Sequence, residues 1–407
     1  MMAPAQLTPW TTAGPAKWPA LPEEMTVSTL MQIETCPRRW ALASAEYPEL
    51  WNGRGYPPRV TLGALAGIVV HLVVETVTRE LVRASCQTAH DSTAVQVMKT
   101  LGGYSCVVQG CIDRVIARCA ENPRAARFLE HAALSLRAQV PDFRARAQAL
   151  LGRVRLSSFG GTVGTRVARA RAPLPNGVFP EIELRAEQIG WKGRADLLVL
   201  SEETSEIIDF KTGKEDEAHR FQITVYALLW SRDSELNPNQ RLVDTLTLAY
   251  SSRDVRVAAP STTQLNALER DLVARRAAAR LAASTRPPEA RPTVENCRFC
   301  EVRQLCDAYW DPAIGSTPRD SWDEPGLVDL EITIVERHGA ASWDGIVSDA
   351  RYRSRGRRIV VRTPNGSLDS NRGDRLRLLD VFLLPPDNPA APLVLTMNAA
   401  SEAFRVL

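Results

Sequence analysis

Two aspartates and a lysine near the middle of the chain have the types and spacing of a hydrolytic metal site. Asp196 precedes the apolar run LLVL, and Asp209 follows the apolar pair II, with Lys211 two residues later. Two carboxylates at the ends of adjacent strands can hold a divalent cation through hard oxygen ligands. Side chains alternate along a strand, so Lys211 is predicted to share a face with Asp209. Carboxylates, a divalent cation and a compact positive charge are the parts that phosphodiester hydrolysis needs.

The residues around this set predict the elements that position it. Alternating apolar residues with turn signals over 178–210 predict three strands in a meander, with the two aspartates on the second and third. Helical spacing returns over 219–232, and a strongly apolar pattern over 61–83 predicts a long earlier helix. Further strands are predicted in LVDTLTLAYSS and DVRVAAP, and an Arg/Ala-rich helix over 261–283. This mixture of strands and helices indicates an α/β domain.

Further polar side chains on these elements extend the set. Gln222 and Tyr226 are four residues apart on the predicted helix, so both lie on one face of it. His71 and Glu75 have the same spacing on the long apolar helix. A single histidine among apolar residues is more often a packed core residue than a metal ligand. Glu183, on the first strand, faces either the cleft or solvent, because its E-I-E alternation fits both.

Taken together, these residues resemble the RecB-like branch of the PD-(D/E)XK nuclease superfamily. The resemblance rests on GRAD, DFKTG and Q-x-x-x-Y in this order on strand, strand and helix, since a D-x-K triplet alone carries no weight. It implies a restriction-endonuclease-like mixed sheet flanked by helices, and a bound Mg²⁺ or Mn²⁺. The implied metal ligands are His71, Asp196 and Asp209, the implied catalytic residues are Asp196, Asp209, Lys211, Gln222 and Tyr226, the further acidic candidates are Glu75 and Glu183, and the DNA-contact candidates are Arg38, Arg39 and Arg194.

The cysteines point to a second metal site. Eight cysteines in a chain with no sign of secretion do not indicate a disulfide framework. Cys297, Cys300 and Cys306 follow a C-x2-C-x5-C pattern, but three thiolates do not close a tetrahedral site. With Cys36, in TCPRRW, the set resembles the iron–sulfur subgroup of RecB-like nucleases, which includes the AddB nuclease domain and CRISPR-associated RecB-like exonucleases. The resemblance implies a 4Fe-4S cluster that staples the ends of the domain together, with Zn²⁺ as the alternative that spacing alone does not exclude.

The composition changes along the chain, which indicates several parts. A flexible arm rich in Pro and Ala is predicted over residues 1–25, and the nuclease-like domain over 26–314. That domain holds a helical insertion at about 84–178 and the cysteine cluster at 297–306. Over 327–407, five short strands separated by Gly, Pro and Asn predict a small β-barrel-like domain, with an OB-like fold among the options.

Bulk composition is that of an ordinary soluble protein, with 44% hydrophobic and 24% charged residues. The net charge of +3 is too small to indicate a nucleic-acid binder, although residues 114–171 contain twelve Arg and three acids. No apolar run approaches the ~20 residues that cross a bilayer. The first residues have neither a basic nor an apolar leader region, so we expect a cytoplasmic protein with no membrane partner.

The function expected from sequence is therefore that of a metal-dependent DNA nuclease, an exonuclease acting on ends or single strands. Its processes would be repair, recombination, or anti-phage and CRISPR defence. No G-x-x-x-x-G-K-[ST] loop occurs in the chain, so a separate helicase is the expected partner for opening duplex ends. The alternative is a catalytically silent nucleic-acid-binding or assembly subunit with a structural metal site.

Overall fold

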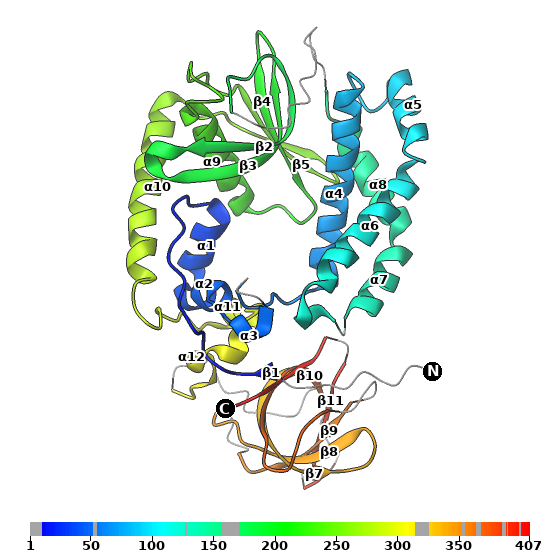
Figure 1. Cartoon of the computed structure of the whole chain (residues 1–407), viewed down its shortest axis with the longest axis vertical. Helices are drawn as coiled ribbons and strands as arrows, with labels where there is room; N and C mark the ends of the chain where they lie inside the picture. The colour runs from blue at the N-terminus through cyan, green and yellow to red at the C-terminus, as the bar shows by residue number, and fades with distance from the viewer. Residues whose placement is uncertain are drawn as a thin grey trace.

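The structure is a computed structural model. It describes residues 10–51, 55–126, 128–156, 171–313, 325–351, 355–363, 368–384, 388, 390–398 and 400–407. A mixed sheet with helices on both faces lies at one end of the molecule, and a β-barrel lies at the other (Figure 1). A segment of short helices and a bundle of longer helices connect the two on opposite sides (Figure 1).

The sheet has five strands in the order β2-β3-β4-β5-β6. All neighbouring strands are antiparallel except β4 and β5, which run parallel, so the sheet is mixed as expected. The helix α9 connects this parallel pair, in the way that crossover helices generally do. The strands are β2 (Gly177–Ala186), β3 (Trp191–Leu200), β4 (Ser205–Lys211), β5 (Thr245–Tyr250) and β6 (Asp254–Val257).

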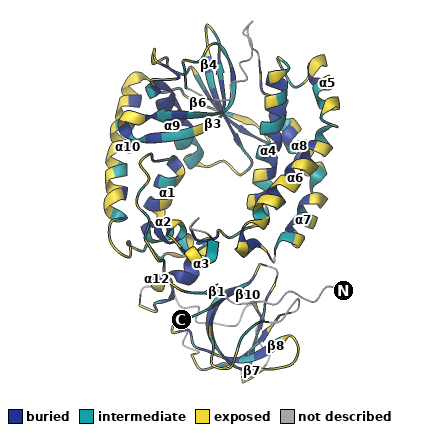
Figure 2. Ribbon diagram, viewed as in Figure 1, coloured by how far each residue is buried: buried dark blue, intermediate teal, exposed yellow. Residues whose placement is uncertain are grey.

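Three helices cover one face of the sheet: α1 (Val27–Thr35), α9 (Glu217–Arg232) and α10 (Thr262–Ala282). The side chains of α9 from Ile223 to Ser231 are all buried except Thr224, because this helix lies between the sheet and α10. The helix α10 buries residues spaced seven apart and leaves its outer face in solvent, coloured yellow in Figure 2. A capping box between Ser261 and Gln264 fixes where this helix begins.

A helical bundle covers the other face through α4 (Leu62–Arg83), which Thr61 caps by accepting from the Ala64 N–H. By length and composition α4 is the one described helix that could cross a membrane. Its valines pack instead against neighbouring helices and the strand residues Leu197, Ile208 and Phe210. The remaining bundle helices are α5 (Ser92–Thr100), α6 (Tyr104–Ala120), α7 (Leu129–Ala138) and α8 (Val140–Leu151), with the turn η1 (Pro123–Ala125).

Short helices from the two ends of the α/β part pack together. Their shared core includes Leu42, Cys300, Cys306 and Trp310. The N-terminal helices are α2 (Pro37–Ser44) and α3 (Pro48–Trp51). The C-terminal ones are α11 (Val294–Arg298), η3 (Arg303–Leu305) and α12 (Asp307–Trp310). A separate short helix in the sheet, η2 (Glu187–Ile189), joins β2 to β3.

The barrel closes because β10 pairs with β7 as well as with β11. Its ring runs β7-β8-β9-β11-β10 and returns to β7, with β9 and β11 parallel and the other pairs antiparallel. The five predicted strands form this ring, and two unpredicted strands extend it beside β10. The strands are β7 (Gly326–Arg337), β8 (Ser342–Val347), β9 (Arg358–Arg362), β10 (Arg375–Leu384) and β11 (Leu393–Thr396), extended by β12 (Glu402–Arg405) and β1 (Trp10–Thr11).

The N-terminal segment differs from the flexible arm expected over 1–25. Residues 1–9 lie outside the described residues, but β1 pairs in parallel with β12, and Met25 is fully buried beside Trp191. Lys17 also forms a bridge with Glu46. The composition suggested a flexible arm because Pro and Ala are common there, whereas the contacts that order the segment come from distant parts of the chain. Of the expected helical insertion, 127 and 157–170 lie outside the described residues, as do 314–324 before the barrel.

Buried arginines attach the barrel to the rest of the protein. Arg124, from the helical bundle, donates from Nε and Nη2 to the two carboxylate oxygens of Glu402, at 2.6 and 2.8 Å. Arg303, on η3 between Cys300 and Cys306, donates to Asp329 at 2.5 Å and to Asp380 at 2.7 Å. Both guanidinium side chains are only 3% exposed, so these pairs form a desolvated junction rather than a surface contact.

Candidate active site

Six of the metal-ligand and catalytic candidates from the sequence line one cleft of about 340 Å³. Two strands, the helices α4 and α9, and the first residues of α1 form its walls. The six are His71 on α4, Asp196 on β3, Asp209 and Lys211 on β4, and Gln222 and Tyr226 on α9; the other lining residues are Thr26, Val27, Ser28, Gly193 and Arg194.

A chain of polar contacts positions Lys211. Its Nζ lies 2.5 Å from Asp209 Oδ2 and donates to Gln222 Oε1 at 2.8 Å. The Nε2 of Gln222 in turn donates to the hydroxyl of Tyr226 at 2.6 Å, as the spacing of four residues on a helix allows. Gly193 makes room for this arrangement, because a Cβ there would lie 2.7 Å from the Tyr226 ring. The lysine amine is therefore held beside a carboxylate by a second row of side chains.

Asp196 and His71 meet across the interface between β3 and α4. Asp196 Oδ2 accepts from the backbone N–H of Phe210 at 2.6 Å and lies 3.4 Å from His71 Nε2. Burial, followed by the nearby charge of Asp209, raises the pKa of Asp196 well above its usual value. Burial lowers the pKa of His71, so the imidazole is neutral, which is the form that binds metals.

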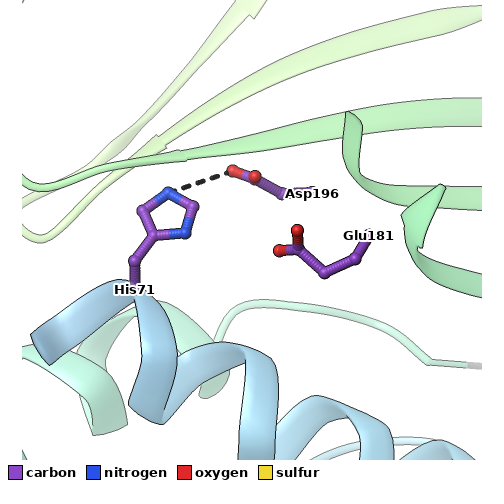
Figure 3. Close-up of side chains that lie close together, drawn as sticks. All are labelled: His71, Glu181 and Asp196. Atoms are coloured by element: carbon purple, nitrogen blue, oxygen red, sulfur yellow. Dashed lines mark ion pairs between the residues drawn. The ribbon is translucent and has the colours of Figure 1, made fainter. Parts of the chain in front are cut away.

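Glu181, which the sequence patterns did not single out, is a further candidate metal ligand. Figure 3 shows its carboxylate pointing toward His71 and Asp196, and one ligand atom from each of the three lies within 4.8 Å of the others. Glu181 lies between Pro180 and Ile182, which pair with the two neighbours of Asp196, and it has a φ of +55°. Such a backbone conformation is rare outside glycine and is concentrated at functional sites. No local sequence pattern marked Glu181, since its place near Asp196 follows from the strand register on either side of it.

The two acidic residues considered from sequence lie elsewhere. Glu183 accepts from Arg185 Nε at 2.8 Å, its side chain is 46% exposed, and it does not line the cleft. Glu75 pairs with Arg79, one turn along α4, at 2.8 Å. The E-I-E alternation left the direction of Glu183 open, and the positive φ of Glu181 gives that glutamate a side-chain direction that strand alternation does not encode.

The donor atoms of the cleft suit a hard divalent cation. One imidazole nitrogen and several carboxylate oxygens converge there, a set typical of Mg²⁺ and Mn²⁺. Asp209 Oδ2 is buried and accepts no hydrogen bond from the described residues, although it is ion-paired with Lys211.

The four selected cysteines also come together. Cys36 ends α1 and begins α2, and it lines a small cavity with Cys297, Cys300 and Cys306. Burial raises the pKa of Cys297 to about 11, with further contributions from Cys306 and Cys36. Burial likewise raises the pKa of Cys300 to about 12. Thiols this reluctant to ionise become thiolates only with a strong compensating charge, and a bound metal supplies one.

The arginines proposed as DNA contacts separate into two groups. Arg38 and Arg39 line the cysteine cavity, and Arg38 donates from Nε to the carbonyl of Pro288 at 2.6 Å. Arg194 lines the catalytic cleft and is 69% exposed. Of the three, only Arg194 therefore stands beside the carboxylates.

Comparison with known proteins identifies a family for most of the chain. Residues 24–307 match the family model of the PD-(D/E)XK nuclease superfamily, a range that includes every residue of the cleft and all four selected cysteines. None of the curated proteins matches the chain.

Solved structures match only weakly. They include the tetrameric p202 HIN2, at 16% identity and a TM-score of 0.17, covering 25% of this chain and 48% of that one. SSO0001 matches at 20% identity and a TM-score of 0.22, covering 32% and 61% of the two chains. A murine DNA-binding protein bound to double-stranded DNA matches at 11% identity and a TM-score of 0.17, covering 56% and 94%. Scores this low carry no structural argument.

Proposed function

The chain belongs to the PD-(D/E)XK nuclease superfamily, and from this premise we propose that it is a metal-dependent deoxyribonuclease. The superfamily implies hydrolysis of phosphodiester bonds in nucleic acid. The observation that carries the proposal is the meeting of Lys211 with Asp209 in the same cleft as Asp196 and His71. A decayed site would be expected to lack at least one of these four side chains.

The cleft residues divide the chemistry among them. His71, Glu181, Asp196 and Asp209 would hold Mg²⁺ or Mn²⁺, which when bound polarises a phosphoryl oxygen and lowers the pKa of water. The ammonium of Lys211 stabilises the negative charge that develops on the phosphoryl group, because it is a compact point charge in a partly buried site.

The proposed activity is exonucleolytic, on DNA ends or single strands. Because the chain has no recognisable ATPase loop, a separate helicase is the proposed partner for duplex substrates. Repair, recombination and anti-phage or CRISPR defence are the proposed processes, and the cytoplasm the proposed location.

At the second site we propose a 4Fe-4S cluster held by Cys36, Cys297, Cys300 and Cys306. The shared cavity supports it. Zn²⁺ is the alternative at the same four thiolates, and iron and sulfide analysis of the purified protein distinguishes the two.

The C-terminal barrel is proposed to be OB-like. Its five-stranded closed ring, with one parallel pair between β9 and β11, supports this assignment. OB folds are Greek-key barrels of five strands that bind oligonucleotides in other proteins. Such a barrel would suit a nuclease that handles single strands.

Cleavage of labelled DNA tests the proposed function. Single- and double-stranded oligonucleotides, labelled at either the 5′ or the 3′ end, are incubated with Mg²⁺ or Mn²⁺ and resolved over time. We expect cleavage by the unaltered chain and none by Lys211→Ala. The matched control is Lys214→Ala, which removes an exposed lysine three residues away, outside the cleft. Equal cleavage by the two variants would remove Lys211 from the mechanism, and no cleavage of any substrate by the unaltered chain would refute the nuclease assignment.

A further inference from the structure

Arg194 and Glu181 form an ion pair at the edge of the catalytic cleft. The Nε of Arg194 lies 2.9 Å from Oε2 of Glu181. The two side chains differ sharply in exposure, at 69% for the arginine and 6% for the glutamate. The pair therefore joins a buried carboxylate to a cation that is mostly in water.

The same carboxylate belongs to the group that suits a divalent cation. Glu181 offers an oxygen within 4.8 Å of the ligand atoms of His71 and Asp196. A buried carboxylate is stable in its charged form only when a cation is near, and Arg194 is a cation in direct contact with Glu181. The solvent-exposed Arg194 thus supplies to Glu181 part of the positive charge that a metal bound in the cleft would supply.

We propose that Arg194 is an exchangeable counter-ion: it neutralises Glu181 in the metal-free protein, and metal binding frees its guanidinium to bind a phosphate of the substrate strand. This inference rests on the proposed metal-dependent nuclease function and extends it to the coupling between metal and DNA.

Charge and geometry support the exchange. A dication among His71, Glu181 and Asp196 satisfies the carboxylate and repels the nearby guanidinium. The guanidinium of Arg194 can move away from Glu181 with little loss of free energy, because its side chain is long and already largely solvated. The fork of a guanidinium fits two phosphate oxygens, and Arg194 lines the cleft where the substrate would lie. Metal and phosphate should therefore strengthen each other's binding, since thermodynamic coupling is reciprocal.

Arg79 provides a matched control. It is also an exposed arginine paired with a carboxylate near the site, because its Nη2 lies 2.8 Å from Glu75 Oε1. Its charge also lowers the pKa of Glu181. Glu75, however, lies outside the group of metal-ligating atoms around His71. Replacing Arg79 removes the same charge without freeing a metal ligand.

The first experiment titrates Mn²⁺ alone into the full chain and its variants, with heat as the signal and no DNA present. Arg194→Ala should bind Mn²⁺ roughly three- to tenfold more tightly than the unaltered chain, because the competing cation is gone. Arg79→Ala should change the affinity less than twofold. Equal or weaker binding by Arg194→Ala would show that the arginine merely supports Glu181, and would overturn the exchange.

Failure of the proposed function is distinguishable from failure of the exchange. If the unaltered chain binds no Mn²⁺ at the cleft, so that Asp196→Ala changes nothing, the metal-dependent function fails first. If it binds Mn²⁺ and Arg194→Ala does not bind more tightly, only the exchange fails.

The second experiment measures binding of a fluorescent single-stranded oligonucleotide, with and without Mn²⁺, in a Lys211→Ala background that blocks cleavage. Adding Arg194→Ala should weaken binding roughly tenfold when Mn²⁺ is present and less than twofold when it is absent. An equal loss under both conditions would mean that Arg194 is free in both states, which contradicts the exchange.

Discussion

The protein contains two candidate metal sites that are built in opposite ways. The catalytic cleft opens to solvent, has oxygen and imidazole donors, and takes most of its residues from two adjacent strands and the next helix. The cysteine cavity is small, has buried thiols, and joins Cys36 to residues more than 250 positions later in the chain. Catalytic sites keep an open position for substrate, whereas structural sites are closed by protein ligands.

The contrast extends to how each site is held in place. In the cleft, side chains support side chains, as Tyr226 supports Gln222 and Gln222 supports Lys211. Around the cysteines, the backbone of two distant segments provides the frame, and the cavity shares its core with Trp310 and the barrel residue Phe404. Changes in the first site should therefore affect chemistry, and changes in the second should affect folding.

The largest effect that would test this contrast is a loss of cleavage without a loss of fold. Replacing Asp209 by Asn keeps the shape of the side chain but removes a carboxylate that contacts Lys211. We expect cleavage to fall roughly 10³-fold, as when a transition-state electrostatic contact is lost. Thermal unfolding should stay within a few degrees of the unaltered chain. A large fall in the unfolding temperature would instead make the cleft a structural site.

Cys36→Ser should show the reverse pattern. Removing one of four ligands should lower the free energy of unfolding by about 3–5 kcal/mol, because metal binding contributes directly to folding. Urea unfolding followed by circular dichroism measures this change, with Cys106→Ser, an exposed cysteine in the helical bundle, as the control. If Cys36→Ser leaves stability unchanged, the cysteine site is not the structural one.

A matched pair of glutamates sharpens the definition of the cleft. Glu181→Gln should reduce cleavage roughly 10- to 100-fold, because it weakens a metal ligand. Glu183→Gln, two residues along the same strand, should change cleavage less than twofold, because its side chain pairs with Arg185 outside the cleft. Rates measured under single-turnover conditions at saturating Mn²⁺ and at low Mn²⁺ would show whether the loss follows metal affinity. Equal effects of the two substitutions would contradict the assignment of Glu181.

The smallest expected effect concerns pH. The folded pKa of Asp196 is raised above the value of about 3.9 for an unfolded chain, so folding takes up a proton between the two values. Without added metal, stability is therefore lost as the pH rises from about 4 through the raised pKa. Asp196→Asn lacks this loss and should become more stable than the unaltered chain at the upper end of that range. Denaturant titrations across pH measure the difference, and a constant difference at all pH values would contradict it.

Local spacing made much of the cleft predictable. Asp209 and Lys211 lie two residues apart on one strand and so share a face of it. Gln222 and Tyr226 lie about one turn apart on one helix, so regular geometry alone brings each pair together. Glu181 escaped prediction because a positive φ sets the direction of its side chain, and alternation does not encode that angle.

Long-range pairing explains what sequence reasoning missed in the fold. The strands β1 and β12 have only two and four residues, too few for a periodic signal. Their pairing depends on β10, and the bond between Arg124 and Glu402 that fixes the barrel spans 278 positions. Neither residue carries a local pattern that names its partner.

The short helix α1 gives this arrangement a mechanical consequence. Its first residues, with Thr26, form part of the catalytic cleft, and Cys36 ends it at the cysteine cavity. Nine residues at about 1.5 Å each make a rod of roughly 13 Å. The N-terminal wall of the cleft is therefore attached directly to the cysteine cavity. Loss of the fold around the cysteines would remove that wall from the cleft.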